Sequence, residues 1–292
     1  MFGVALLAAL LSVTLIVRKA KPYVVVDARS YAVAFVPAGH LELVGTTSPR
    51  HGLEPGGIPF AGIRFVPMLP NDALLRAFAG DSMPANAAPR AHSLQRLEVT
   101  SGCTVRLELY VDGKVRLDIE GPPPQGAECR MAAGLMLTTP RSERWETVDI
   151  PSRPITAGSP ATLIFKPPYP LHLRNVPVSA LRFETTDTGL VRSAILEARL
   201  ELPEVGAVGD AARTAYLGDP LTLGEIRGDI AEIVVRDTIR TLFKGEAKAP
   251  VIASADLRPT LIEYLAHTHW QLALAVVAGA VAFASAILPK EK

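Results

Sequence analysis

Two cysteines, Cys103 and Cys129, are the residues with the most definite chemistry in this sequence. An even number of cysteines allows a disulfide if the segment between them faces an oxidising compartment. Two free thiols in a reducing compartment are the alternative, and the compartment decides between the two. Neither cysteine belongs to a CxxC pair, and no cysteine–histidine cluster has the spacing of a zinc site. The pair therefore indicates a disulfide or two free thiols, and we expect no metal site.

Among the six histidines, His267 and His269 form the only close pair, directly before Trp270. On a helix, side chains two residues apart point about 200° away from each other, so these two rings would not share a ligand. One interpretation is a haem, chlorophyll or metal ligand at a membrane surface. The other, which we adopt, is a polar collar next to an aromatic residue of the membrane interface. We accordingly expect no cofactor.

Motifs for phosphate binding and for hydrolysis are missing from the sequence. It contains no GxxxxGK[ST], GxGxxG, HExxH or GxSxG pattern. Carboxylates are scattered along expected strands, where a solvated face explains them. The formal net charge of +1 does not suggest a nucleic-acid partner. We therefore predict a protein that is not an enzyme, with no catalytic residue, and a membrane-tethered hydrolase is only a third alternative.

Two uncharged apolar runs, residues 1–17 and 270–288, lie at opposite ends of the chain. As a helix the second run would span roughly 28 Å, close to the thickness of a bilayer's hydrocarbon core. We place the first transmembrane helix at residues 1–17. The second is placed at residues 264–288, because a short helical segment is expected directly before its apolar run. No Lys or Arg precedes the first run and no A-x-A-like site follows it, which favours an uncleaved anchor over a signal peptide. The expected membrane-interface residues are Arg18, Lys19, Lys21, His267, His269 and Trp270.

Small residues recur every four positions in both expected helices, a spacing that lets helices pack closely in lipid. The frequency of alanine in apolar runs is the simpler explanation of the same pattern. Neither run contains a charged residue or a histidine, so neither is expected to line an ion path. We expect partners among other membrane protein subunits and the lipid bilayer. The candidate packing residues are Ala5, Ala9, Ala275, Ala278, Gly279, Ala282 and Ala286.

The orientation follows from the basic residues after the first run. Arg18, Lys19 and Lys21 favour a cytoplasmic location for the segment that follows them, in a bacterial-type inner membrane. Lys290 and Lys292 argue weakly for the opposite orientation. A bond between Cys103 and Cys129 would reverse the prediction and place this segment in the periplasm.

The segment between the runs has the pattern of a mainly β, sandwich-like soluble domain. Its 25 prolines and 22 glycines fall largely between short apolar runs, as turns do between strands. Residues 105–111 and 114–119 alternate apolar and polar on either side of Asp112-Gly113, a strong hairpin signal. We expect Val111 on the buried face, and residues 191–202 to form the longest strand. The expected units are a small β-rich subdomain at 22–90, with a short helix at 71–79 and a linker at 81–93, and a sandwich-like domain at 91–250.

These patterns favour a non-catalytic accessory or scaffold subunit of a membrane protein complex. Its alanine-rich helices would dock in lipid, and its β domain would contact partners. A ligand- or peptide-binding module tethered to the membrane is the second interpretation.

Overall fold

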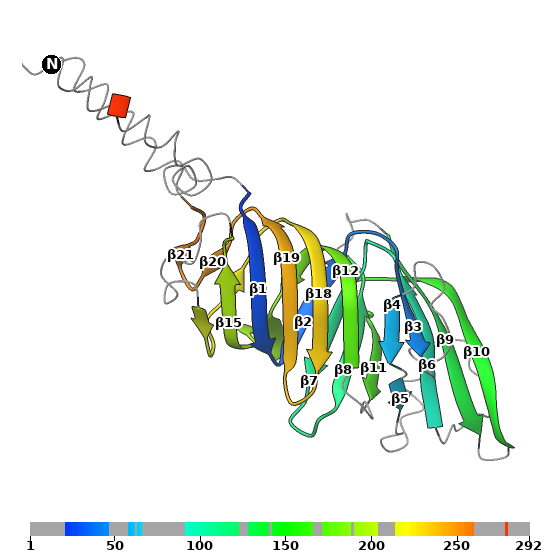
Figure 1. Ribbon diagram of the computed structural model, residues 1–292. Coiled ribbons are helices and arrows are strands. Elements are labelled where there is room, and N and C mark those ends of the chain that lie inside the picture. The colour runs from blue at the N-terminus through cyan, green and yellow to red at the C-terminus, as the bar shows by residue number, and fades with distance from the viewer. Residues whose placement is uncertain are drawn as a thin grey trace, which may run out of the picture.

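The computed structural model describes residues 21–46, 58–61, 63–65, 91–122, 128–139, 142–165, 171–187, 190–203, 214–259 and 278–279. Their backbone is dominated by strands, and the prediction of a mainly β domain is confirmed (Figure 1). Helical backbone occurs in these ranges only at Ala278 and Gly279. In the part of the chain described, no helix has both the length and the apolar character needed to cross a bilayer. The expected helix at 71–79 lies outside the described residues, as do the expected transmembrane helices apart from 278–279.

The largest sheet has ten strands, each antiparallel to its neighbours. Its strand order is β11-β8-β7-β2-β12-β18-β19-β1-β15-β16. The strands are β1 (Tyr23–Ser30), β2 (Ala32–Pro37), β7 (Thr104–Leu109), β8 (Val115–Glu120), β11 (Ala161–Phe165), β12 (Leu171–Arg182), β15 (Ile195–Glu201), β16 (Thr214–Tyr216), β18 (Ile226–Val235) and β19 (Ile239–Ala247).

A second sheet has six strands, and two small sheets complete the domain. The six-stranded sheet comprises β3 (Leu41–Thr46), β4 (Ile58–Ala61), β5 (Ile63–Phe65), β6 (Ala91–Val99), β9 (Cys129–Thr139) and β10 (Ser142–Ile155), in the order β10-β9-β6-β3-β4, with β5 paired to β6. The small sheets are the pair β13 (Glu184–Asp187) and β14 (Leu190–Ser193), and the set β17 (Leu221–Thr222), β20 (Val251–Ile252) and β21 (Ala255–Asp256).

The chain crosses between the two large sheets repeatedly. It passes from β2 to β3, from β6 to β7, from β8 to β9 and from β10 to β11. β4 contacts β12 without pairing to it. β1 and β2, from the expected unit at 22–90, pair in the same sheet as strands from the expected unit at 91–250.

Both large sheets contribute to one hydrophobic core. Val26, Phe35 and Phe243 of the ten-stranded sheet belong to the same buried cluster as Leu97 and Met131 of the six-stranded sheet. Strict alternation explains this burial, because successive side chains in a strand point to opposite faces. β19, for example, alternates buried residues with exposed or half-buried ones from Ile239 to Ala247. Shared burial between two sheets is consistent with the predicted sandwich-like domain.

The predicted hairpin is present, but its loop is longer by one residue. Leu109 pairs with Val115, Gly113 donates its N–H to Tyr110 O at 2.9 Å, and Gly113 has φ of 75°. A type I turn followed by a left-handed glycine therefore replaces the expected two-residue loop. Val111 then lies at the tip of the turn, fully exposed, and its predicted place on the buried face is wrong.

Two further predicted elements have different limits. The expected strand at 191–202 is divided at Ala194, because β14 pairs with β13 while β15 pairs with β1. It is therefore not the longest strand, since β10 has 14 residues. β6 begins at Ala91, so it includes the last three residues of the expected linker.

Candidate functional site: the disulfide and the end carrying both chain exits

The described domain begins and ends side by side. Ala247 donates its backbone N–H to Pro22 O at 3.0 Å, and Tyr23 pairs with Glu246 in the β1–β19 ladder. β1 and β19 are neighbours in the large sheet, although they lie near opposite ends of the chain. Figure 1 shows the start of β1 at the same end of the domain as β20 and β21. We call this the exit end, because the chain enters and leaves the domain there.

The last described segment of the domain is fastened to the exit end. Lys248 and Ala249 donate their N–H groups to Glu225 O and Leu223 O, at 2.9 and 3.1 Å. β20 pairs with β17 and then turns into β21. At the turn, Ala253 donates to Pro220 O at 2.9 Å. Because backbone hydrogen bonds anchor it at several points, the segment up to residue 259 has a defined position on the domain.

Cys103 and Cys129 form a disulfide, at the point where the chain passes between the two large sheets. Cys103 directly precedes β7 of the ten-stranded sheet, and Cys129 is the first residue of β9 in the six-stranded sheet. Both cysteines are buried, with exposed fractions of 0% and 1%. The bond therefore joins the two sheets from inside the core.

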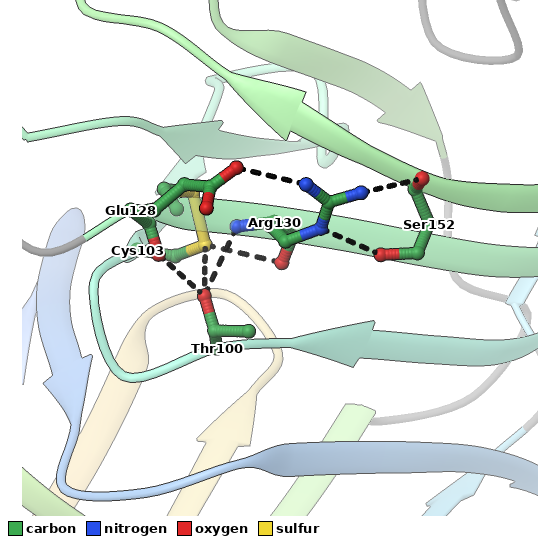
Figure 2. Close-up of a disulfide and its surroundings, with 6 residues drawn as sticks. Thr100, Cys103, Glu128, Arg130 and Ser152 are labelled. Atoms are coloured by element: carbon green, nitrogen blue, oxygen red, sulfur yellow. Dashed lines mark hydrogen bonds and ion pairs between the residues drawn. A yellow bond between two sulfur atoms is a disulfide. The ribbon is translucent and has the colours of Figure 1, made fainter.

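Hydrogen bonds hold the backbone on both sides of the disulfide (Figure 2). The Thr100 hydroxyl accepts the Arg130 N–H and donates to Glu128 O, both at 3.0 Å. The Arg130 guanidinium donates to Glu128 Oε1 at 2.8 Å, to Ser152 Oγ at 3.1 Å and to Ser152 O at 3.2 Å. Arg130 thus connects the disulfide to β10. No sequence pattern singles out Thr100, Arg130 or Ser152, because their proximity depends on the pairing of β9 with β6 on one side and with β10 on the other.

The surroundings of the disulfide suit a structural bond more than a reactive one. Thiol–disulfide exchange requires a thiolate to reach a sulfur atom, and burial prevents this approach in the folded domain. A sequence separation of 26 residues corresponds to a loop-closure stabilisation of about 3.5 kcal/mol in the chain-entropy description.

Ion pairs connect neighbouring strands on the outer face of the large sheet. Arg240 donates to both carboxylate oxygens of Asp27, at 2.9 and 2.6 Å. These hydrogen bonds lower the pKa of Asp27 and raise that of Arg240. Arg174 of β12 donates to Glu232 of β18 at 3.0 Å. The face is therefore charged, with acids and bases paired across strands.

One carboxylate on an expected solvent-facing position is buried instead. Asp118 of β8 has a side chain exposed by only 4%. It accepts hydrogen bonds from Arg116 Nε at 3.0 Å and from Thr162 Oγ1 at 2.5 Å. Burial lowers the pKa of Arg116, but its side-chain hydrogen bonds with Tyr110 and Asp118 outweigh this effect, so the pKa is raised overall. Such pairing is what a buried charge requires.

Most membrane-interface and helix-packing residues predicted from sequence lie outside the described residues. The exceptions are Lys21, which is exposed at the exit end, and Ala278 and Gly279, which are helical and exposed. A Cβ atom on Gly279 would have no neighbouring atom within 4 Å. The predicted roles of the whole set remain predictions. The residues outside are Ala5, Ala9, Arg18, Lys19, His267, His269, Trp270, Ala275, Ala282 and Ala286.

The described part of the chain contains no group of three or more His, Cys, Asp or Glu side chains placed to hold a metal ion. No family model matches the chain, and no curated protein or solved structure matches it significantly.

Proposed function

We propose that this chain is a non-catalytic accessory or scaffold subunit of a bacterial-type membrane protein complex. Two transmembrane helices, at residues 1–17 and 264–288, would hold a β-sandwich-like domain at the bilayer. The observation that best supports this proposal is the hydrogen bond from Ala247 to Pro22. If both anchors lie in one bilayer, the chain must enter and leave the domain at the same end. β1 and β19 meet this requirement because they are antiparallel neighbours, so β1 begins beside the residues where β19 ends.

The proposal places the β domain on the periplasmic side. The basic residues after the first apolar run favour the cytoplasm by the positive-inside rule. The Cys103–Cys129 disulfide favours an oxidising compartment, because cytosolic reductants keep thiols reduced. We give the disulfide more weight, since long domains cross membranes largely regardless of charge.

The proposed anchors would also be the docking elements. Small residues at four-residue spacing, such as Ala275 with Gly279, allow helix backbones to approach closely in lipid. The paired charges on the outer face of the sheet, such as Arg240 with Asp27, suit a domain that stands in water beside its partners.

Thiol labelling of the full-length protein in cells tests its sidedness. We expect a membrane-impermeant maleimide to leave Cys103 and Cys129 unlabelled in intact cells and in denatured extracts, and to label both once a reductant is added to the denatured extracts. A Ser254→Cys variant, exposed at the exit end, should be labelled in intact cells without reductant. Labelling of Ser254→Cys only after the inner membrane is permeabilised would place the domain in the cytoplasm.

Purification in mild detergent tests the scaffold role. We expect the protein to co-purify with other membrane proteins in a fixed ratio. Purification as a lone monomer with a bound small molecule would instead identify a ligand-binding module and contradict the proposal.

A further inference from the structure

The strand that ends the six-stranded sheet on one side, β10, is also the longest strand described. It has 14 residues, and within the described part of the chain it pairs only with β9. The other strands that end the two large sheets, β4, β11 and β16, have only 4, 5 and 3 residues. Figure 1 shows β10 at the outer side of the domain, away from the exit end. A long unpaired strand edge is a template for pairing with another chain, because its N–H and C=O groups lack partners.

The hydrogen bonds of β9 show which of its residues face β10. Arg130 donates its N–H to Thr100 Oγ1 at 3.0 Å, and it accepts the Thr100 N–H at 3.1 Å. Thr100 directly follows β6, so the backbone groups of Arg130 point toward β6. Successive residues of a paired strand direct their N–H and C=O groups to opposite sides. The even-numbered residues of β9 therefore bond toward β6, and the odd-numbered ones bond toward β10.

Three residues of β10 consequently direct their backbone groups away from the sheet. A residue opposite one that bonds to the far side makes no ladder bond itself, so its N–H and C=O point outward. Trp145, Thr147 and Asp149 lie opposite residues 138, 136 and 134 of β9 and meet this condition. They present three N–H and three C=O groups in alternation, which is the pattern that an extended polypeptide strand recognises. We call residues 145–150 the β10 edge.

The β10 edge has a limit on each side. The register with β9 shifts between Ser142 and Trp145, and it shifts again after Ile150. At the second shift, the Arg130 guanidinium donates to Ser152 Oγ and to Ser152 O. Pro154 lies opposite Arg130, so its nitrogen, which carries no hydrogen, faces outward. Bulges and prolines prevent strand pairing at an edge, so only the six residues between them can accept another strand.

The charge of the β10 edge indicates the chemistry of its occupant. The edge contains Glu146 and Asp149 and no Lys or Arg. The Asp149 side chain is 74% exposed, and its Oδ1 lies 3.9 Å from Arg96 Nη2, a long ion pair that leaves room for a second cation. Opposite charges stabilise facing positions of paired strands, and like charges destabilise them. The edge of a second copy would bring the same two acids, so the charges favour a basic segment of a different protein.

We propose that the β10 edge binds an extended, basic segment of a different protein subunit, which adds a strand to the six-stranded sheet. Backbone hydrogen bonds to Trp145, Thr147 and Asp149 supply the affinity, and a Lys or Arg opposite Asp149 supplies the selectivity. The inference rests on the proposed function, because it names the surface that holds the scaffold's partner. It does not depend on where the membrane anchors lie.

Hydrogen–deuterium exchange at single-residue resolution tests the inference on the full-length protein. It is measured on the assembly purified in mild detergent, and again after a harsher detergent has separated the subunits. In the assembly we expect the amides of Trp145, Thr147 and Asp149 to exchange at least about tenfold more slowly than in the separated protein. The amides of Glu146 and Val148 should change little, because they bond to β9 in both samples. This alternation identifies an added strand, whereas a surface that merely covered β10 would not produce it.

Two substitutions at one position test the outward N–H of Thr147. Thr147→Pro removes this donor and leaves the β9 ladder intact, since proline is tolerated where the N–H faces away from the sheet. We expect it to lower the amount of co-purifying subunit at least about tenfold, because the ring also obstructs the added strand. Thr147→Val keeps the N–H and is the matched control, which should retain the subunit.

Reversing the charge at the edge tests the basic character of the occupant. Asp149→Lys should lower the amount of co-purifying subunit as well, whereas Asp149→Asn should lower it less. Thermal unfolding of each variant shows whether a lost subunit reflects a lost fold. If Thr147→Pro unfolds the domain, the exchange pattern of the wild-type protein decides the matter.

The remaining outcomes separate this inference from the proposed function. If a subunit co-purifies in a fixed ratio but Trp145, Thr147 and Asp149 exchange equally in both samples, the inference fails and the scaffold role stands. The inference also fails if the protected edge is paired with a second copy, which co-purification of tagged with untagged chains reveals, or if Asp149→Lys strengthens the association. If nothing co-purifies in a fixed ratio, both fail.

Discussion

Gly228 and Gly245 face each other across β18 and β19 with no room for a side chain on either. A Cβ atom on Gly228 would lie 2.5 Å from the Gly245 Cα, and a Cβ atom on Gly245 would lie 2.5 Å from Arg227 O. Glycine in a strand commonly marks such a close approach of two backbones. The pair occupies the middle of the ten-stranded sheet, next to β1, whose first residues form part of the exit end.

Gly228→Ala and Gly245→Ala should each destabilise the domain by about 1–3 kcal/mol, because the added methyl group forces two paired strands apart. Denaturant unfolding of each variant measures this change. Gly39→Ala is the matched control, because a Cβ atom there meets nothing within 4 Å, and we expect it to be nearly neutral. Equal stability of all three variants would contradict the close approach of the two strands at Gly228 and Gly245.

Replacing both Cys103 and Cys129 by serine should lower the free energy of unfolding by about 3.5 kcal/mol, because the unfolded chain gains the freedom of the closed loop. Reductant should leave the folded wild-type protein unchanged over hours, since both sulfur atoms are buried. Denaturant titrations with and without reductant test both expectations. Rapid reduction under native conditions would show that the disulfide is accessible.

The Asp27–Arg240 pair should make stability depend on pH in the acidic range. Because Arg240 holds the pKa of Asp27 below its ordinary value, the folded state binds the proton less readily than the unfolded state. The ion pair's contribution to stability is therefore complete above the pKa of Asp27 in the unfolded chain, about 4. It is lost as pH falls through the lower pKa of Asp27 in the folded state.

Asp27→Asn should accordingly cost under about 1 kcal/mol at neutral pH, as expected for an exposed pair, and the cost should shrink below about pH 4. Unfolding midpoints of wild type and variant between pH 2 and pH 7 measure the difference. Asp237→Asn, in the exposed turn between β18 and β19, is the control and should show a smaller dependence. If Asp27→Asn destabilised the protein more at acidic pH than at neutral pH, the prediction would be wrong.

Ala253→Gly should stabilise the domain by about 0.5–1 kcal/mol. Ala253 has φ of 53° in the turn between β20 and β21, where a Cβ atom is unfavourable and glycine is not. Thermal unfolding of the variant checks this prediction. Ala255→Gly, in the adjacent strand β21, should instead be neutral or slightly destabilising, because glycine there only increases the freedom of the unfolded chain.

The alternation of residue types by itself determined which faces of the strands are buried. Val105, Leu107 and Leu109 of β7, and Val115, Leu117 and Ile119 of β8, are all buried, as their spacing predicts. This works because successive side chains in a strand point to opposite faces, whatever the strand is paired with. The mainly β class could be predicted for the same reason.

Tertiary structure decided everything that depends on which strands become neighbours. The alternating strand patterns predict a buried Val111 and a solvent-exposed Asp118. A longer turn exposes Val111, and pairing with Arg116 and Thr162 accommodates a buried Asp118. The approach of Cys103 to Cys129, of Pro22 to Ala247 and of Tyr31 to Leu109 likewise requires particular strand pairings and turns. The alternation of residue types along a strand does not predict which strand it pairs with, since each strand offers the same backbone donors and acceptors to any neighbour.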